Sequence, residues 1–405
     1  MIRLKDTKHA NTSDFLSSAI NIAEYYGFSA LESMRPARMK ADDTEKRRAA
    51  RTTPETEITY ARRDERALTS SARKCAASIR GLTEPGGLLA YRVVQQGAGS
   101  PATTLELHVV GTASAVAEAL LLVVANAIIE EAGMTDRHLA INNIGSNESS
   151  NRFVRDVSAY LRKHIESISP TLRPRAAIDP LGTLVQLIER GHPAAPRAPQ
   201  AMEYLTEEER RKFWELLEYL EVYGLAYELT PSVLGSRDCW AHSLYEISVP
   251  DEETGGRTSI AFGGRYDPLV SRFSAAPSSA AVISINCEVR GKTKVDRVVQ
   301  GLPAMYFAHL GGEARRRSLV VLEMLRRESI PVHQSLLHER IGEQMIKAKQ
   351  LAVPYILIMG YKEAMENTIL VREVSTNSQE AIPVDDLAGY LKRHRVGTWK
   401  TRALV

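Results

Sequence analysis

The stretch Ile260-Ala261-Phe262-Gly263-Gly264-Arg265-Tyr266-Asp267-Pro268-Leu269-Val270 carries an apolar strand start directly into a glycine pair and three polar side chains. Adjacent glycines allow a backbone to pass close to a ligand or to adopt a positive φ. Arg265, Tyr266 and Asp267 then offer a fork of donors, a ring with a hydroxyl, and an acceptor. The pattern indicates a ligand-holding strand end, but it is also typical of an ordinary turn followed by surface charges.

Length and composition place the chain among ordinary globular proteins. It has 405 residues, 44% of them hydrophobic and 25% charged, which is enough for two or three domains with a large core. The net charge of +3 is weak evidence for a polyanionic partner. Cys75, Cys239 and Cys287 are far apart and match no zinc spacing, so we expect no metal site and a reducing compartment.

The chain shows no targeting segment of its own. Its first residues lack the apolar core of a signal peptide, and the longest apolar run, residues 119–129, is far shorter than a membrane span. We therefore expect a cytoplasmic protein with no membrane partner.

Residues 35–74 differ in composition from the rest of the chain. Lysine and arginine dominate, acidic residues are interleaved, and apolar residues are sparse. The composition predicts a flexible basic segment, which is either a solvated loop or a contact for nucleic-acid phosphates.

Hydrophobic patterning predicts two kinds of architecture in sequence. Residues 115–132 form a helix that is apolar on most sides and hence buried, with Glu118 expected to cap it or face solvent. Strands at 243–249 and 258–262 form an antiparallel hairpin, and residues 280–289 form a further strand. After residue 298 strands alternate with helices, which predicts a compact α/β domain.

Several stretches, taken in order, resemble histidyl-tRNA synthetase, a class II aminoacyl-tRNA synthetase. Residues 261–270 are similar to its histidine-pocket signature, with Pro268 where the family usually has glycine. The other matching stretches are residues 141–149 (INNIGSNES), 160–164 (YLRKH), 179–181 (DPL), 331–332 (PV), 349–355 (KQLAVPY), 367–374 (NTILVREV) and 378–380 (SQE). The resemblance covers nearly the whole chain, because the order and spacing of these stretches match as well as their letters.

The resemblance implies a fold and a division into domains. The fold would be α+β, a class II synthetase-like antiparallel sheet flanked by helices, with a C-terminal α/β anticodon-binding-like domain. We expect the catalytic-core-like domain to span residues 1–298, including the flexible basic segment 35–74, and the anticodon-binding-like domain to span 303–393. Residues 394–405 would form a basic tail.

The resemblance also implies a chemistry. Histidine and ATP with Mg²⁺ form histidyl-adenylate, and the histidyl group then passes to the 3′ end of tRNA. Arginines stabilise the charge that develops on the α-phosphate. In this chain the implied catalytic arginines are Arg290 and, as replacements, Arg237 and Arg92. The implied histidine-binding residues are Gly263, Gly264, Arg265, Tyr266, Asp267 and Asp238.

Five stretches depart from the family pattern, four of them as follows. The histidine-binding Arg-Pro-Glu-x-Thr turn aligns with residues 68–74, which have neither Pro nor Glu. The motif 2 arginine falls at Gln95 or Gln96, and Glu106 and His108 stand out of step with the Gln and Glu of that motif. Bulkier residues replace the glycines of motif 3, and Met34 stands at the motif 1 proline.

The second histidine motif, Arg-Gly-Leu-Asp-Tyr-Tyr, aligns with residues 235–240. Its arginine falls on Gly235, and its tyrosine pair becomes Cys239 and Trp240. If the segment is a strand, Arg237 lies on the same face as position 235 and is a partial substitute.

These departures leave three hypotheses about function. The first is a synthetase-like protein that binds tRNA and whose histidine and ATP sites are eroded. The second is an active histidine–tRNA ligase, and the third is a regulatory synthetase-like subunit of histidine biosynthesis. The resemblance further implies a homodimer. For RNA contacts the candidate residues are Lys349, Tyr361, Lys362, Arg372 and Gln379.

Overall fold

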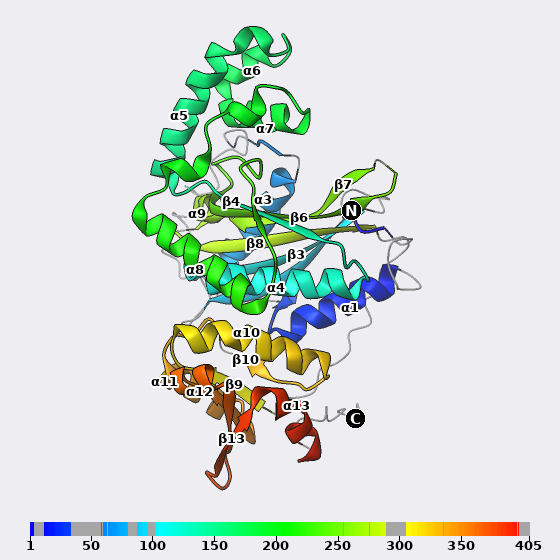
Figure 1. Ribbon diagram of the computed structural model, residues 1–405, viewed down its shortest axis with the longest axis vertical. Coiled ribbons are helices and arrows are strands. Elements are labelled where there is room, and N and C mark those ends of the chain that lie inside the picture. The colour runs from blue at the N-terminus through cyan, green and yellow to red at the C-terminus, as the bar shows by residue number, and fades with distance from the viewer. Residues whose placement is uncertain are drawn as a thin grey trace, which may run out of the picture.

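The computed structural model describes residues 1–3, 12–33, 58, 60–62, 64–79, 87–95, 102–253, 255–274, 276–288, 305–334, 336–394 and 396. No helix among these residues is long and apolar enough to cross a membrane. Two sheets organise them, an eight-stranded sheet from the first three quarters of the chain and a five-stranded sheet from the last quarter (Figure 1).

The large sheet is antiparallel apart from its two edge pairs, in the order β1-β2-β3-β8-β7-β6-β4-β5. Its strands are β1 (Ser29–Ala30), β2 (Leu88–Gln95), β3 (Ala102–Val110), β4 (His138–Asn143), β5 (Glu228–Leu229), β6 (Ala241–Asp251), β7 (Gly256–Arg265) and β8 (Ala280–Glu288). The expected hairpin is confirmed, because β6 pairs with β7, and β7 pairs in turn with β8.

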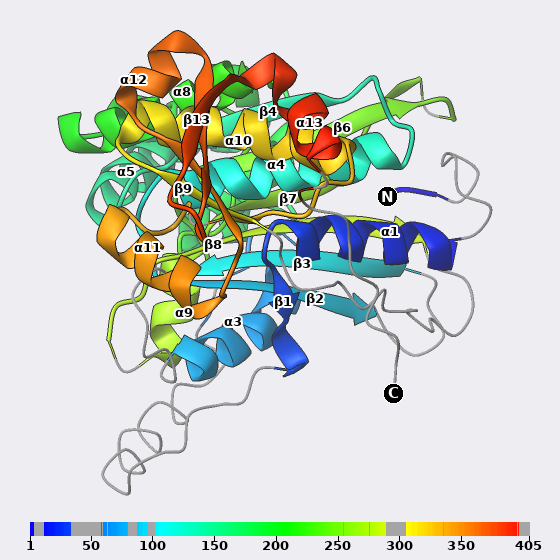
Figure 2. The same ribbon diagram turned by 90° about the horizontal axis from the view of Figure 1, so that it is seen from below.

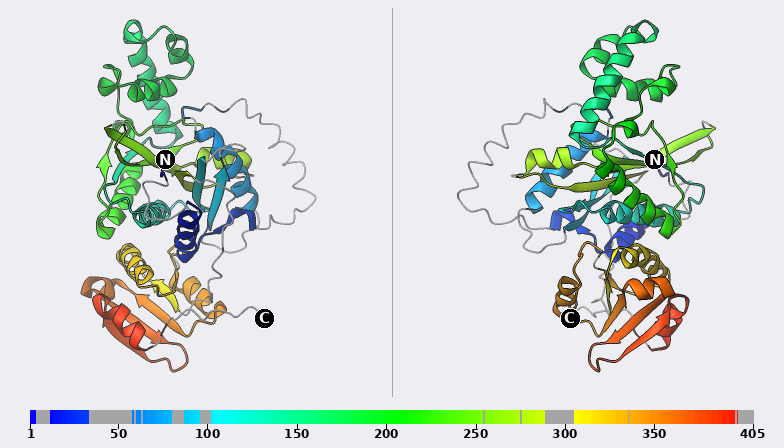
Figure 3. Two further views of the ribbon diagram at one scale, coloured as in Figure 1. Left: turned by 90° about the vertical axis from the view of Figure 1, so that its right-hand side faces the viewer. Right: turned by 60° about the vertical axis from the view of Figure 1, so that its left-hand side comes forward.

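Helices cover both faces of this sheet. The helices of this part of the chain are α1 (Thr12–Tyr25), α3 (Glu65–Ile79), α4 (Val116–Glu131), α5 (Asn147–Lys163), α6 (Arg173–Ile178), α7 (Pro180–Glu189), α8 (Glu207–Tyr223) and α9 (Asp267–Phe273). Helices α1, α4 and α8 lie on one face and α3 and α9 on the other (Figure 2). Helices α5 to α7 project away from the sheet at the end of the molecule opposite the C-terminal sheet (Figure 3).

Helix α4 is buried on all sides, as its uniformly apolar sequence predicts. Fourteen of its sixteen residues are buried, because it lies between the sheet, α1, α8 and the C-terminal part of the chain. A helix without a polar face is stable in water only under such cover.

The C-terminal sheet has the order β10-β9-β11-β12-β13, with parallel β10, β9 and β11 and antiparallel β12 and β13. Its elements are β9 (Met305–His309), α10 (Gly312–Arg327), β10 (His333–Gln334), α11 (Ile341–Gln350), β11 (Tyr355–Met359), α12 (Tyr361–Glu366), β12 (Thr368–Glu373), β13 (Gln379–Pro383) and α13 (Val384–Arg393). The expected alternation of strands and helices is confirmed.

Helix α10 joins the C-terminal part to the large sheet. Glu323 on α10 is buried and accepts a hydrogen bond from the Tyr26 hydroxyl at 2.7 Å, while Arg326 and Arg327 neutralise its charge at 2.7 Å each. Arg327 also pairs with Glu130 of α4 at 3.0 Å. The charges in this network neutralise one another. The hydrophobic cores of the large sheet and of the C-terminal sheet are continuous.

The prediction of a flexible segment over residues 35–74 is wrong for residues 65–74. Residues 65–74 belong to α3, where Leu68, Ala72 and Cys75 are buried against the sheet. The basic residues of this helix obscured an apolar face that repeats every three to four positions. Residues 34–57 lie outside the described part of the chain.

The close approach of strands at Gly263 provides a test of the register. A Cβ at this position would lie 2.2 Å from the Val282 carbonyl oxygen and 2.6 Å from the Tyr245 ring. Gly263→Ala is therefore expected to lower the free energy of unfolding by about 1–3 kcal/mol in urea denaturation, because overpacking displaces two strands. In Gly342→Ala, on α11, the new methyl group meets no atom within 4 Å, so stability should hold or rise slightly. Equal effects of the two substitutions would contradict this register.

Candidate functional site

Arg265, the first polar residue of the Gly-Gly-Arg-Tyr-Asp stretch, forms a buried ion pair. Its Nη1 lies 3.0 Å from Oε2 of Glu118 on α4, and both side chains are at most 7% exposed. Its Nη2 donates to the Thr112 carbonyl oxygen at 2.8 Å, and its Nε lies 3.5 Å from Asp267 Oδ1. Ser243 donates to the other oxygen of Glu118. Each of the three guanidinium nitrogens thus has a partner within the chain itself.

Glu118 is therefore not the capping or solvent-facing residue expected from the sequence. It is buried because α4 lies on the sheet directly below Arg265. Burial raises the pKa of the Glu118 carboxyl to about 7, and the charge of Arg265 opposes this rise. A carboxylate inside a uniformly apolar helix needs a buried cation, and that requirement predicts a partner for Glu118 but not which residue supplies it.

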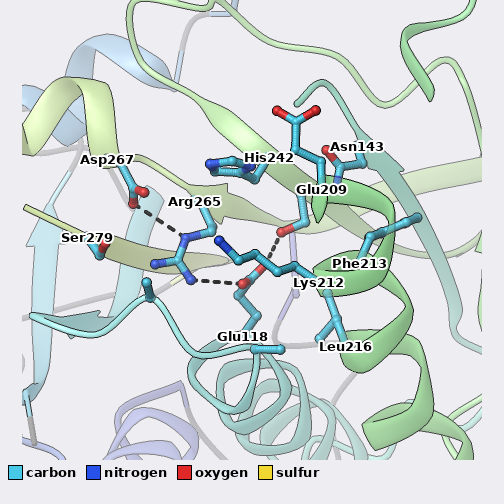
Figure 4. A pocket seen from close by; sticks show the side chains of 13 residues that line it. Glu118, Asn143, Glu209, Lys212, Phe213, Leu216, His242, Arg265, Asp267 and Ser279 are labelled. Carbon is cyan, nitrogen blue, oxygen red and sulfur yellow. Dashed lines mark hydrogen bonds and ion pairs between the residues drawn. The ribbon is translucent and has the colours of Figure 1, made fainter. Parts of the chain in front are cut away.

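A pocket of about 250 Å³ lies beside this ion pair, at the end of the sheet between α4 and α8 (Figure 4). Its charged and polar lining residues are Glu118, Asn143, Glu209, Lys212, His242, Ser243, Arg265, Asp267 and Ser279. Glu209 supports the pocket wall rather than serving as a free carboxylate. Although burial opposes the shift, donors at Thr206 and Ser146 lower its pKa to about 2.

His242 enters this pocket from an irregular point in β6. The register between β6 and β7 shifts between Ala241 and Leu244, and His242 has a φ of 56°. Such a bulge re-aims a side chain. Burial lowers the pKa of the His242 imidazole, with Asp267 opposing the shift, so the neutral form is favoured.

Tyr266 points to the opposite face of the sheet from Arg265. Its hydroxyl lies 2.8 Å from His108 Nδ1 and 3.5 Å from Cys75 Sγ on α3, and the side chain is fully buried. His108 Nε2 lies 3.2 Å from Glu106, which accepts from Ser71 Oγ at 2.5 Å. Glu106 and His108, which stood out of step with the family pattern, therefore fill the space beside Tyr266.

The structure does not gather the predicted histidine-binding residues around one cavity. Gly263 and Gly264 lie within β7, Arg265 and Asp267 line the pocket beside α4, and Tyr266 lies under α3. Asp238 pairs with Arg272 of α9 at 3.0 Å. Strand β7 ends at Arg265, and Tyr266, the residue before α9, places its side chain on the other face of the sheet.

The candidate catalytic arginines are also in internal contacts or outside the description. Arg92 donates to Ser71 Oγ at 2.7 Å and pairs with Glu32 at 3.0 Å. Arg237 is exposed and contacts Asn151 of α5. It lies in a turn and not in a strand, so the premise that it shares a face with position 235 is wrong. Arg290 lies outside the described residues.

The turn that holds Asp238 is tied to α3 by Glu65, which sequence reasoning did not single out. The Glu65 carboxylate accepts from Ser236 N at 2.7 Å, from Trp240 Nε1 at 3.0 Å, and from Ala61 N and Arg62 N at 2.6 and 2.9 Å. Burial raises the pKa of Glu65 to about 7, against these four donors. The partners are far apart in sequence, so no local pattern indicates the contact.

The predicted RNA-binding residues fall into two groups on the C-terminal sheet. Tyr361, 69% exposed, and the exposed Lys362 begin α12 just after β11. Arg372 and Gln379 pair across β12 and β13 at the opposite end of the strands, and Lys349 lies on the last turn of α11, ahead of β11.

Comparison with known proteins identifies the lineage. Residues 307–394 match the family model for the anticodon binding domain. The chain is 26% identical over 354 residues to the histidine–tRNA ligase of Bacillus licheniformis, covering 82% of this chain and 83% of that protein. It is 25% identical over 345 residues to the ligase of Thermosynechococcus vestitus, covering 81% and 80%. Over about four fifths of its length the chain is thus similar to histidine–tRNA ligases.

This similarity explains the order of the two sheets. The large antiparallel sheet is the class II synthetase sheet, and the C-terminal sheet is the anticodon-binding domain. Apo histidyl-tRNA synthetase of S. aureus superposes with a TM-score of 0.49 at 17% identity, covering 94% of this chain and 95% of the other, and the assignment does not depend on it.

The buried ion pair gives a prediction with a defined pH dependence. Arg265→Met is expected to lower the free energy of unfolding by about 3–5 kcal/mol at pH 8, because Glu118 stays buried without its cation. The loss should be smaller at pH 5. Burial raises the pKa of Glu118 while Arg265 opposes the rise, so removal of Arg265 should raise this pKa further. Below its folded-state pKa the buried carboxyl holds a proton and carries no charge, and the variant loses stability as pH rises from the unfolded-state pKa through the folded-state pKa.

Urea denaturation of matched variants checks this result. The double variant Glu118→Leu/Arg265→Met should be more stable than Arg265→Met alone, since it leaves no unpaired charge. The exposed pair of Arg257 and Asp136, 3.2 Å apart, is the control, and Arg257→Met should cost no more than about 1 kcal/mol. Glu118→Leu is measured alone as well. If the losses of Glu118→Leu and Arg265→Met simply add up to the loss of the double variant, the pairing is contradicted.

Proposed function

We propose that this chain binds tRNA through its anticodon-binding domain and does not form histidyl-adenylate, because its histidine- and ATP-binding groups are eroded. The relatives named above are histidine–tRNA ligases. An active enzyme of that kind would use ATP with Mg²⁺ and histidine. The proposal rests on how this chain employs the positions that such a ligase needs.

The packing at Gly235 carries the proposal. This is the position that aligns with the arginine of the second histidine motif. A Cβ built there would lie 2.5 Å from Trp240 Cδ1 and 2.8 Å from Glu65 Oε1. Any side chain at position 235 would thus displace a buried ring and a carboxylate with four donors. Trp240 and Glu65 fill the space that an arginine side chain at position 235 would need, so more has changed than the loss of one side chain.

Three further positions support the same conclusion. The Tyr266 hydroxyl is hydrogen-bonded to His108 and Cys75. The Arg92 guanidinium donates to Ser71 and forms an ion pair with Glu32. Arg265 neutralises Glu118. A cation whose charge is already balanced by a buried carboxylate stabilises an α-phosphate far less than a free one. When catalytic groups act as a unit, loss of one group lowers the rate about as much as loss of all of them.

Pyrophosphate exchange tests the catalytic half of the proposal. Purified full-length protein with ATP, Mg²⁺ and radiolabelled pyrophosphate should show no exchange that depends on histidine. Loss of even one charge-stabilising group slows such reactions by about two to three orders of magnitude. Histidine-dependent exchange above the background without histidine would establish an active ligase and reject this half.

Salt-dependent binding of tRNA tests the other half. Lys349→Ala and Lys362→Ala should each weaken binding and reduce the slope of log K against log salt by about 1, since each removes one phosphate contact. Tyr361→Ala should cost about 1–3 kcal/mol of binding if a base stacks on the ring.

Glu366→Ala is the matched control for these variants. Glu366 lies 3.9 Å from Lys362 and carries the opposite charge, so its removal should leave binding unchanged or strengthen it. Equal binding by the wild type and all three variants would reject the anticodon-binding domain as the RNA-binding surface.

A further inference from the structure

The pocket beside Arg265 shares Arg265 and Glu118 with the proposed function, but the other groups on which that function depends lie elsewhere. It lies on the α4 and α8 face of the large sheet, whereas Tyr266, Glu65 and Gly235 lie on the α3 face. Its walls come from the N-terminal turns of two long helices, the bulge in β6 and the residues just after β7 (Figure 4). A ligand in this pocket therefore need not touch Tyr266, Glu65 or Gly235 on the α3 face.

The charges that line this pocket have a negative excess. Glu118, Glu209 and Asp267 are acidic, and Arg265 and Lys212 are basic. Arg265 is committed to Glu118 and Asp267, and Lys212 pairs at 2.8 Å with Glu208 outside the lining. Both cations are thus balanced, which disfavours an anionic ligand.

Two acceptors in the pocket remain unused by the described residues. Asp267 Oδ1 accepts from Ala280 N at 2.7 Å and lies near Arg265, but no described residue donates to its Oδ2. The His242 imidazole likewise makes no hydrogen bond with the described part of the chain, and it faces Asp267, Arg265, Glu209 and Lys212. A neutral imidazole offers one acceptor nitrogen.

The opposite wall of the pocket is apolar. Phe213 and Leu216 of α8 and Ala113 and Ala115 ahead of α4 line it. A ligand that fits both walls has a short hydrocarbon chain and a group that donates several hydrogen bonds and carries positive charge. Among the described residues no three metal-binding side chains converge, so a chelated metal ion is a poorer match.

We propose that this pocket binds a small aliphatic primary amine, with its ammonium group on Asp267 and His242 and its chain against Phe213 and Leu216. An ammonium group supplies three donors, two of which satisfy these acceptors. Hydrogen bonds between ions are among the stronger ones in proteins. The volume of about 250 Å³ suits a chain of a few carbon atoms.

Calorimetry with n-butylamine and the intact protein tests the proposal. n-Butanol has the same chain without the charge, and butyrate has the opposite charge. We expect saturable binding of n-butylamine at one site per chain, and at least tenfold weaker binding of n-butanol and butyrate. Absence of n-butylamine binding, or equal binding of the three compounds, would overturn the proposal.

Variants locate the site. Asp267→Asn keeps the acceptor for Ala280 N and removes the charge, and His242→Asn keeps a residue type that tolerates a positive φ. Each should weaken n-butylamine binding about tenfold, while Asp136→Asn on the exposed surface should leave it unchanged. Equal binding by Asp267→Asn and Asp136→Asn would overturn the assignment of this pocket.

His242→Asn decides the matter if Asp267→Asn does not fold, as judged by its thermal unfolding midpoint. Binding of histidine with no binding of n-butylamine would also overturn the proposal, by showing that the site selects an amino acid. Failure of the amine site leaves the pyrophosphate exchange result untouched, so the two proposals fail separately.

Discussion

The buried ion pair between Arg265 and Glu118 is the constraint on which the rest of the large sheet depends. Two charges that are almost inaccessible to water persist only when each neutralises the other and the remaining hydrogen-bonding groups are satisfied. Thr112, Ser243 and Asp267 supply those contacts. The pair therefore fixes where β7 ends relative to α4, and α4 in turn carries the core shared with the C-terminal sheet.

Arg265 lies on the α4 face, and the next side chain lies on the other face of the sheet. Tyr266 lies there under α3, where His108, Glu106 and Ser71 satisfy one another. The turn at residues 235–240 closes the same face through Glu65 and Trp240. The chain thus keeps the class II synthetase sheet, and the side chains at the positions that we propose have lost their ligand-binding role make internal contacts. A signature in the sequence records ancestry, and its chemistry depends on which contacts its side chains make.

What the sequence predicted correctly was set by local patterns. The β6–β7 hairpin, the buried helix α4 and the alternating C-terminal elements follow from periodicity along continuous stretches. Glu118 and Glu65 were missed because their partners lie 147 and 175 residues away. Helix α3 was obscured by its basic residues, and Arg237 was assigned to a strand that is a turn. Membership of one pocket was assumed from adjacency in sequence, but Arg265 and Tyr266 place their side chains on opposite faces of the sheet.

The central claim is that the Gly-Gly-Arg-Tyr-Asp stretch and its neighbours no longer form a histidine-binding site. Titration of the full-length protein with histidine by isothermal calorimetry, in the presence and absence of ATP and Mg²⁺, tests it most directly. The account predicts no saturable heat under either condition, because Tyr266, Arg265 and the space above Gly235 are occupied. Saturable binding of one histidine per chain would contradict it.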